Sequence, residues 1–121
     1  MRWHHGLRSR WPLRRFVVVE DSMGPALRPG DGLLAVRSGD VRPGQVRVFR
    51  DPRGRAMYLV KRVGAVRVTE AASMFEARSD NQAALGATDS RHFGWVPAAE
   101  SYRVVLAVRG WRISVLRPDG V

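Results

Sequence analysis

The sequence predicts a small, mostly β domain of antiparallel strands with little helix. Apolar runs of about five residues recur along the chain, and Gly-, Pro- and Asp-containing turn sequences separate them, a pattern typical of short antiparallel strands. The runs lie at residues 16–19, 33–36, 46–49, 57–63, 104–108 and 113–116, with turn sequences at 38–40, 42–44, 51–54 and 109–110. Only in the segment 69–77 does the pattern leave helix and strand undecided.

The length of 121 residues fits one domain with a real core but not two. We expect a basic N-terminal arm at residues 1–15, with five Arg, two His and two Trp, and a single domain at residues 16–121. No stretch approaches the roughly 20 apolar residues of a membrane-spanning helix, and the arm lacks the apolar region of a secretory signal. These features predict a cytoplasmic protein, or one peripheral to the membrane whose arm, Met1 to Arg15, contacts anionic lipid weakly.

The charge and composition narrow the classes of partner. The formal net charge is +10, but the Arg residues are scattered beyond position 15 and no aromatic stacking motif accompanies them. This pattern favours a solvated surface over a specific nucleic-acid site. The absence of Cys excludes disulfides, thiol catalysis and Cys-bound metal, and the adjacent His4 and His5 are a weak metal signal. We therefore expect no metal and no cofactor.

One stretch, residues 20–31, suggests a functional turn. An apolar run stops at two acids, Ser22 follows them, and Gly24, Pro25 and a second turn at 29–31 come next. Ser22 is thus predicted on a tight connection at the end of a strand, where its hydroxyl can project into a cleft. Ordinary turn chemistry is the alternative, because a serine is a poor nucleophile until a base takes its proton.

The candidate base is Lys61, the single Lys among 21 basic residues. Arg stays protonated in proteins, whereas the pKa of a buried Lys can fall by a few units. Strand alternation places Lys61 on one face with Met57, Leu59 and Val63, which would remove it from water. The alternatives are a lysine kept on an edge strand for solubility, or chance.

Three segments, in order, resemble motifs of the signal peptidase I family of Ser/Lys proteases. Residues 22–31, Ser-Met-Gly-Pro-Ala-Leu-Arg-Pro-Gly-Asp, are similar to the S-M-x-P-x-L-x-x-G-D motif. Residues 58–63 resemble the K-R-V motif, and residues 79–81 with 89–97 resemble the motif G-D-N…D-S-R-x-F-G-x-V-P. Together they cover most of the chain from Val17 to Pro97, and three motifs in order are a strong signal.

The resemblance implies a β fold of the signal-peptidase and repressor-protease type. It assigns Ser22 as the nucleophile and Lys61 as its base, with the Ser22 N–H as an oxyanion donor. Met23 and Pro25 would line the cleft with Ser22, although both could simply pack and shape the turn. A peptide substrate would bind as an extended strand.

The third motif implies structural support for the site. Asp80 and Asn81 would orient neighbouring strands. Asp89 and Arg91 are expected to share a face of an extended segment and to form an ion pair, and Ser90 to make a local hydrogen bond. A triad of Ser22, Asp89 and His92 is a less favoured alternative, because the family places the base at Lys61.

The chain departs from the family pattern at several positions. Ala26 replaces a common Thr, and Glu20 stands where exporting members often have a hydroxyl that helps the oxyanion hole. Ser79 replaces a Gly at the start of the third motif. Ala87 occupies the place of a serine that contacts the lysine in family members, and Thr88 is the expected substitute.

The predicted function is a serine endopeptidase that removes an N-terminal propeptide or leader. Size and motif form are most similar to the proteases that mature nickel-type superoxide dismutase. One alternative is a signal-peptidase-like protease docked on the membrane by its arm. A second, of another class, is a basic, non-enzymatic β module that binds nucleic acid. A self-cleaving repressor is disfavoured, because only 21 residues precede Ser22.

Overall fold

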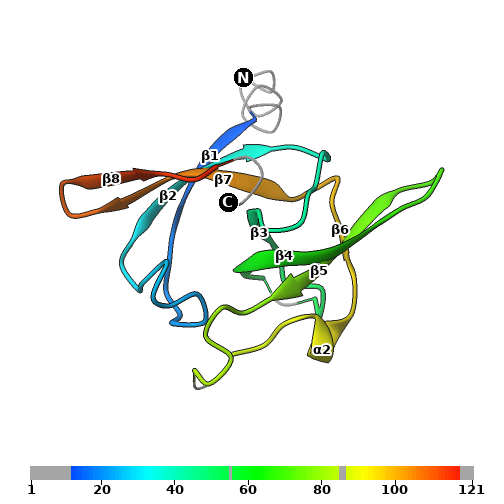
Figure 1. Cartoon of the computed structure of the whole chain (residues 1–121), viewed down its shortest axis with the longest axis horizontal. Coiled ribbons are helices and arrows are strands. Elements are labelled where there is room, and N and C mark those ends of the chain that lie inside the picture. Colours follow the sequence, from blue (N-terminus) through cyan, green and yellow to red (C-terminus); the bar gives the residue numbers. More distant parts are fainter. Residues whose placement is uncertain (1–11, 55, 85–86, 118–121) are drawn as a thin grey trace.

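The computed structural model describes residues 12–54, 56–84 and 87–117, and these form a mostly antiparallel β structure with one short helix (Figure 1). This confirms the predicted fold class. The elements are β1 (Leu13–Val17), β2 (Gly32–Arg37), β3 (Val46–Arg50), β4 (Tyr58–Val68), β5 (Ser73–Arg78), α2 (Ser90–Phe93), β6 (Val96–Pro97), β7 (Tyr102–Arg109) and β8 (Arg112–Val115).

The strands follow the order β1-β2-β7-β3-β4-β5-β6, and β8 also pairs with β7. One edge of β7 pairs with β2. The other edge is shared, because β3 pairs with Tyr102 and Arg103, whereas β8 pairs with the segment from Leu106 to Arg109. The sheet therefore divides along β7 into two parts, which Figure 1 shows as the β7–β8 hairpin and the β3–β6 strands.

The core consists of two clusters of buried apolar side chains. The first cluster contains Val18, Met23, Leu27, Leu33, Ala35, Val46, Val48, Tyr102, Val104 and Ala107. The second contains Val41, Phe49, Leu59, Val63, Phe75, Ala77, Val96 and Ala98. The rings of Phe49 and Phe75 meet edge to face with centroids 5.7 Å apart. Strand β4 contributes to the second cluster, and it also carries Lys61.

The first strand lies earlier than predicted, since pairing with β2 runs from Leu13 to Val17 and not over residues 16–19. Residues 13–15 of the expected arm thus belong to the sheet, while residues 1–11 lie outside the described residues. Arg14 explains part of the shift, because its guanidinium lies 4.8 Å from the ring centroid of Tyr58. The apolar run misled the prediction because Val17 and Val19 are 66% and 72% exposed.

Two other segments also differ from expectation. The undecided segment 69–77 contains most of β5, and β4 continues to Val68, beyond the expected end at residue 63. In the segment 89–91, expected to be extended, Ser90 and Arg91 form the start of α2, and only the N-cap Asp89 is extended. No helix in the described part of the chain is long and apolar enough to cross a membrane.

Candidate active site

Ser22 lies in a turn that its own apolar neighbours anchor. The backbone N–H of Val18 donates to the carbonyl of Asp31 at 2.9 Å, which closes the loop between them. Met23 and Leu27 are buried in the first core cluster, and the Leu27 N–H donates to the Met23 carbonyl at 2.9 Å. The side chains on either side of the turn therefore hold Ser22, which is itself only 2% exposed.

Gly24 allows this turn to be tight. Its N–H donates to the carbonyl of Asp21 at 3.2 Å, and its peptide bond to Pro25 is cis. A Cβ at Gly24 would lie 2.8 Å from Asp21 Oδ1, closer than side chains pack. A side chain at this position would therefore displace Asp21, the residue that precedes the nucleophile candidate.

A small cavity of about 50 Å³ opens beside Ser22. It lies between residues 16–20 and the start of β4, and it is lined by Phe16, Val17, Val18, Val19, Glu20, Ser22, Leu33, Val48, Tyr58, Leu59 and Val60. Met23 and Pro25, expected in the cleft, do not line it. Met23 points into the core instead, and Pro25 borders a separate hollow with Asp80 and Asn81.

Lys61 occupies the buried face of β4, as strand alternation predicted. It is 0% exposed, and Leu59 and Val63 on either side of it are also buried. Its Nζ donates to Ser79 Oγ at 2.9 Å. The only lysine of the chain is therefore a buried amine with a specific hydrogen-bond acceptor, and not a solvated lysine on an edge strand.

Burial lowers the pKa of Lys61 below its ordinary value, because the charged ammonium loses water. The carboxylates of Glu20 and Asp89 act in the opposite direction, and the nearby guanidinium of Arg53 lowers the pKa further. Desolvation is the largest of these effects, so the amine loses its proton at a lower pH than an exposed lysine does. A neutral amine is the form that can accept a proton from a hydroxyl.

The segment from Ser79 to Asn81 connects the two candidate catalytic residues. The backbone N–H of Asn81 donates to the carbonyl of Ser22 at 2.8 Å, and the Asn81 side-chain amide donates to the carbonyl of Asp21 at 3.2 Å. Two residues earlier, Ser79 accepts the hydrogen bond from Lys61. Ser22 and Lys61, distant in sequence, are thus held by the same short piece of chain.

Asp80 ties this segment to the strand that carries Lys61. Its carboxylate accepts two hydrogen bonds from Arg62, at 2.8 Å from Nη2 and 3.2 Å from Nε. Arg62 also donates to the carbonyl of Gly44 at 3.0 Å. Asp80 and Asn81 therefore fix the position of residues 79–81 from two sides.

The remaining residues of the third motif hold Ser79 and its surroundings in place by hydrogen bonds. Asp89 is buried, and its Oδ2 accepts a hydrogen bond of 3.4 Å from the Ser79 N–H. The expected ion pair is present, since Arg91 Nε lies 3.0 Å from Asp89 Oδ1. Its basis differs from the prediction, because Arg91 lies in α2, which Asp89 caps, and not in an extended segment. Ser90 Oγ accepts from the Ala77 N–H at 2.7 Å, so its hydroxyl ties α2 to β5 and does not make the local bond expected of it.

His92 takes part in the same helix cap. Its Nδ1 accepts from the backbone N–H of Asp89 at 3.3 Å, and its side chain is half exposed. No contact between His92 and Ser22 is present among the described residues. The geometry thus gives His92 a capping role and offers no support for the alternative triad.

The sequence did not identify Ser79 as the partner of Lys61. The hydroxyl of Thr88, the expected substitute, instead accepts from Arg53 Nη2 at 3.5 Å, and the Thr88 carbonyl accepts from Ser79 Oγ at 3.3 Å. The signal that could have found Ser79 is strand pairing. Arg62 pairs with Arg78, so the next antiparallel positions are Lys61 and Ser79.

Ser22 has two polar groups that a catalytic role would use, its hydroxyl and its backbone N–H. Within the described ranges, neither its hydroxyl nor its backbone N–H has a hydrogen-bond partner, and Lys61 donates to Ser79 rather than to Ser22. In the same ranges, no group of three or more His, Asp or Glu is placed to hold a metal ion.

Comparison of the sequence with models of known protein families and with curated proteins finds no match to either.

Proposed function

We propose that the protein is a serine endopeptidase of the signal peptidase I type, in which Ser22 is the nucleophile and Lys61 is the general base. The observation that carries the proposal is the environment of Lys61, a fully buried lysine with a lowered pKa whose hydrogen-bond partner belongs to the segment that also binds Ser22. Perturbed amines of this kind are concentrated at functional sites.

The proposed reaction needs two proton transfers per half-reaction. Neutral Lys61 takes the proton from Ser22 Oγ as that oxygen attacks the carbonyl carbon of the scissile peptide bond. The protonated amine then gives the proton to the leaving nitrogen as the C–N bond breaks. Water hydrolyses the acyl-enzyme in the same way, with Lys61 accepting its proton and returning it to Ser22.

The oxyanion would be stabilised by the unengaged N–H of Ser22. Glu20 lines the same cavity, but an ionised carboxylate accepts hydrogen bonds and cannot donate one. Loss of one oxyanion donor typically lowers kcat by about 10²–10³. We therefore propose a slow protease, suited to a single cleavage in a maturation step rather than to general digestion.

The cavity supports a preference for a small side chain next to the scissile bond. Its volume of about 50 Å³ is far below the size of a ligand pocket for a large side chain. The substrate would lie between residues 16–20 and the start of β4, which border the cavity. We propose a propeptide or leader as the substrate and, following the resemblance, the precursor of nickel-type superoxide dismutase.

The test is acylation by a penem, followed by intact mass measurement from pH 6 to pH 10. We expect one adduct on the wild type, formed faster as pH rises, and none on Ser22→Ala or Lys61→Met. Ser38→Ala is the matched control, because it removes a hydroxyl that accepts from the Asp40 N–H and does not line the cavity beside Ser22. Equal labelling of Ser22→Ala and wild type would reject the assignment.

The substrate is tested separately by incubating the protein with a nickel-type superoxide dismutase precursor. Cleavage at one position near the precursor N-terminus is expected with the wild type and not with Ser22→Ala. If the penem labels the enzyme but the precursor stays intact, this substrate is rejected, whereas the assignment of Ser22 and Lys61 is not.

A further inference from the structure

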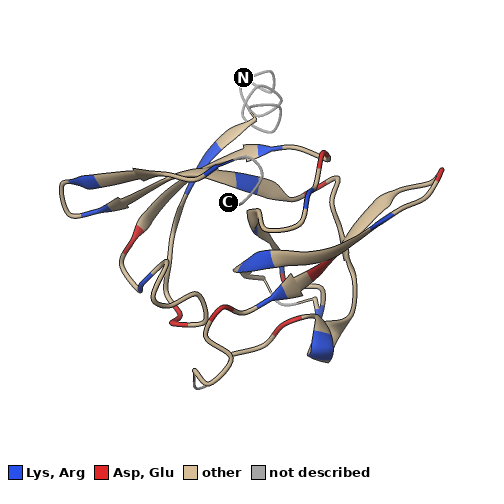
Figure 2. Ribbon diagram, viewed as in Figure 1, with Lys and Arg blue, Asp and Glu red and all other residues tan. Residues whose placement is uncertain are grey.

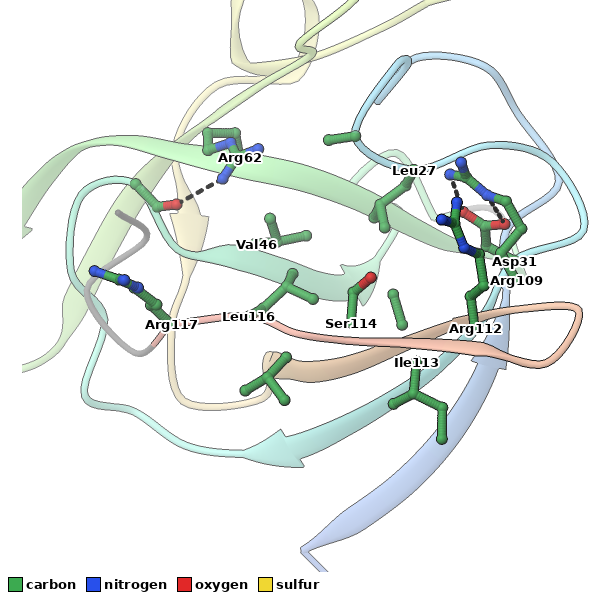
Figure 3. Close-up of a pocket in the computed structure, with 14 residues that line it drawn as sticks. Leu27, Asp31, Val46, Arg62, Arg109, Arg112, Ile113, Ser114, Leu116 and Arg117 are labelled. Carbon is green, nitrogen blue, oxygen red and sulfur yellow. Dashed lines mark hydrogen bonds and ion pairs between the residues drawn. The ribbon is translucent and has the colours of Figure 1, made fainter.

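A second, larger cavity is lined by none of the residues that line the small one beside Ser22. It has a volume of about 590 Å³ and opens between the β7–β8 hairpin, the first residues of β3 and the loop that follows Ser22 (Figure 3). Volumes of this size are typical of pockets that bind ligands or peptide side chains. The proposed reaction makes no use of it.

The division of the sheet creates this pocket. The same edge of β7 pairs first with β3, at Arg103 and Tyr102, and then with β8, from Leu106 onward. Because β3 and β8 diverge from this edge, the space between Val46 and Leu116 is not filled by a strand. Both residues line the pocket.

The floor of the pocket is apolar. Leu27 and Val46 belong to the first core cluster, and Leu116 packs against the same cluster. In Figure 3 the side chains of Ser114 and Leu116 point from β8 and the following residue toward Val46 and Leu27. An apolar side chain placed here would therefore continue the core of the protein and gain from leaving water.

The rim is basic. Arg62, Arg109, Arg112 and Arg117 line the pocket. Two of them are neutralised, because Arg62 pairs with Asp80 at 2.8 Å and Arg109 pairs with Asp31 at 2.8 Å.

Arg112 and Arg117 have no acidic partner in the described part of the chain. The pocket thus carries an excess of two positive charges, although basic residues as a whole are spread over both parts of the sheet (Figure 2). A bound molecule with two negative charges would neutralise this excess.

The positions of these two cations suit a particular shape of ligand. Arg112 and Arg117 lie at opposite ends of the pocket, with Ser114 and Leu116 between them (Figure 3). A bound peptide of five residues in the extended conformation is about 17 Å long, at roughly 3.4 Å per residue. A small dianion such as phosphate could not reach both guanidinium groups, whereas an extended peptide of about five residues could.

The backbone of β8 provides a further reason to favour a peptide. Among the described strands β8 pairs only with β7, so its second edge carries N–H and C=O groups without a strand partner. Such an edge binds extended peptides by main-chain hydrogen bonds.

We propose that this pocket binds an extended peptide segment that has acidic side chains at its two ends and apolar side chains between them. The acidic groups pair with Arg112 and Arg117, and a central apolar side chain covers Leu27 and Val46. This inference rests on the proposed function, since it assigns the segment to the protein substrate, at a site separate from Ser22. It predicts that the substrate carries such an acidic segment in addition to its cleavage position.

The test uses the Ser22→Ala protein and a fluorescein-labelled pentapeptide with Glu at both ends and Val-Leu-Val between, followed by fluorescence anisotropy at 50 mM salt. Binding should be weakened about tenfold in a variant that also carries Arg112→Gln and Arg117→Gln, the loss of two exposed ion pairs. It should also weaken at 500 mM salt, where exposed charges are screened.

One control repeats the loss of two positive charges elsewhere on the protein, and the other reverses the charge of the peptide. Arg15→Gln with Arg50→Gln removes two exposed guanidinium groups that do not line the pocket, and it should leave affinity unchanged. The same pentapeptide with Lys at both ends should not bind.

The proposal is overturned if the Arg112/Arg117 variant binds as tightly as its parent, if the Lys-ended peptide binds equally well, or if no binding is seen up to 1 mM peptide at low salt. Displacement of the peptide by inorganic phosphate at similar concentration would also overturn it, in favour of a small-anion site. Because binding is measured without cleavage and penem labelling does not involve the pocket, failure of one proposal is distinguishable from failure of the other.

Discussion

Lys61 on β4 donates a hydrogen bond to Ser79, the residue that follows β5, with Lys61 Nζ 2.9 Å from Ser79 Oγ. A neutral amine has two N–H groups and one lone pair. Engaging one N–H with Ser79 limits the directions in which the lone pair can point. Ser79 is in turn fixed by its own bonds to the Thr88 carbonyl and to Asp89. We therefore infer that Ser79 positions the base of the proposed reaction.

Ser79→Ala should lower the rate of penem acylation by about 10- to 100-fold, because a displaced base is no longer aligned with its proton. The midpoint of the pH–rate profile should also move to lower pH. A hydrogen bond accepted by Ser79 stabilises the ammonium form of Lys61, so its loss lowers the pKa of the amine further. Stopped-time labelling from pH 6 to pH 10 measures both effects.

Ser79→Thr is expected to restore part of the rate, since it returns the hydroxyl. A merely structural role would reduce the amount of folded protein without moving the pH midpoint. The positioning role is rejected if Ser79→Ala reacts at the wild-type rate with the wild-type midpoint.

The sequence predicted the environment of Lys61 better than its contacts. Alternation along residues 57–63 placed Lys61 with Met57, Leu59 and Val63. Lys61, Leu59 and Val63 are buried, and Met57 packs half-buried against the second core cluster. That prediction needed only the period of one strand. The contact with Ser79 needed the register of β4 against β5, and the segment 69–77 gave no clear strand pattern from which to derive it.

The described fold shows the same limit elsewhere. Turn residues located most strands within a few positions, but β1 was misplaced because its pairing with β2 begins at Leu13, includes Arg14 and Arg15, and ends at Val17. The large pocket could not be foreseen, because it depends on β7 changing partners from β3 to β8. Strand order of this kind is a property of the whole chain and not of a local pattern.

Lys61→Met should increase stability near neutral pH. Burial lowers the pKa of folded Lys61 below its ordinary value of 10.5, so below the lowered pKa the folded state bears the full penalty of a buried charge. Between the lowered pKa and 10.5 the unfolded state binds more protons, and wild-type stability rises with pH. The advantage of the variant should therefore be largest at low pH in this range and shrink toward pH 10.5.

Urea denaturation of both proteins from pH 6 to pH 10.5 measures this difference. A gain that is independent of pH would contradict the assignment, because methionine would then be acting through packing alone. Arg50→Met, which changes an exposed charge on β3, controls for the change in net charge.

Asp31→Asn should lower the melting temperature by about 5 °C at pH 7, since hydrogen bonds between charged groups are among the stronger ones. Asp31 is buried and accepts from Arg109 Nε at 2.9 Å and Nη2 at 2.8 Å. Arg109 holds the pKa of Asp31 below its ordinary 3.8. The stabilisation is thus present above 3.8 and is lost as pH falls through the lowered pKa.

Scanning calorimetry of Asp31→Asn and wild type at several pH values should show melting temperatures that converge in acid. Asp40→Asn is the matched control, because its partner Arg42 is 3.6 Å away and both side chains are exposed. A constant difference down to the lowest pH would argue against an effect of charge at Asp31.

Arg47→Met should reduce the free energy of unfolding by about 3 kcal/mol, because buried acceptors would be left without donors. Arg47 is 0% exposed in β3, and burial lowers its pKa to about 10. Its guanidinium donates to Gln45 Oε1 at 3.0 Å, Ser101 Oγ at 2.8 Å, the carbonyl of Asp40 at 2.9 Å and the carbonyl of Ser38. Arg47→Lys should not rescue stability, since an ammonium lacks the planar fork that reaches all four. Urea denaturation measures the loss, and Arg50→Met is the exposed control on the same strand. Equal losses of stability in Arg47→Met and Arg50→Met would contradict the prediction.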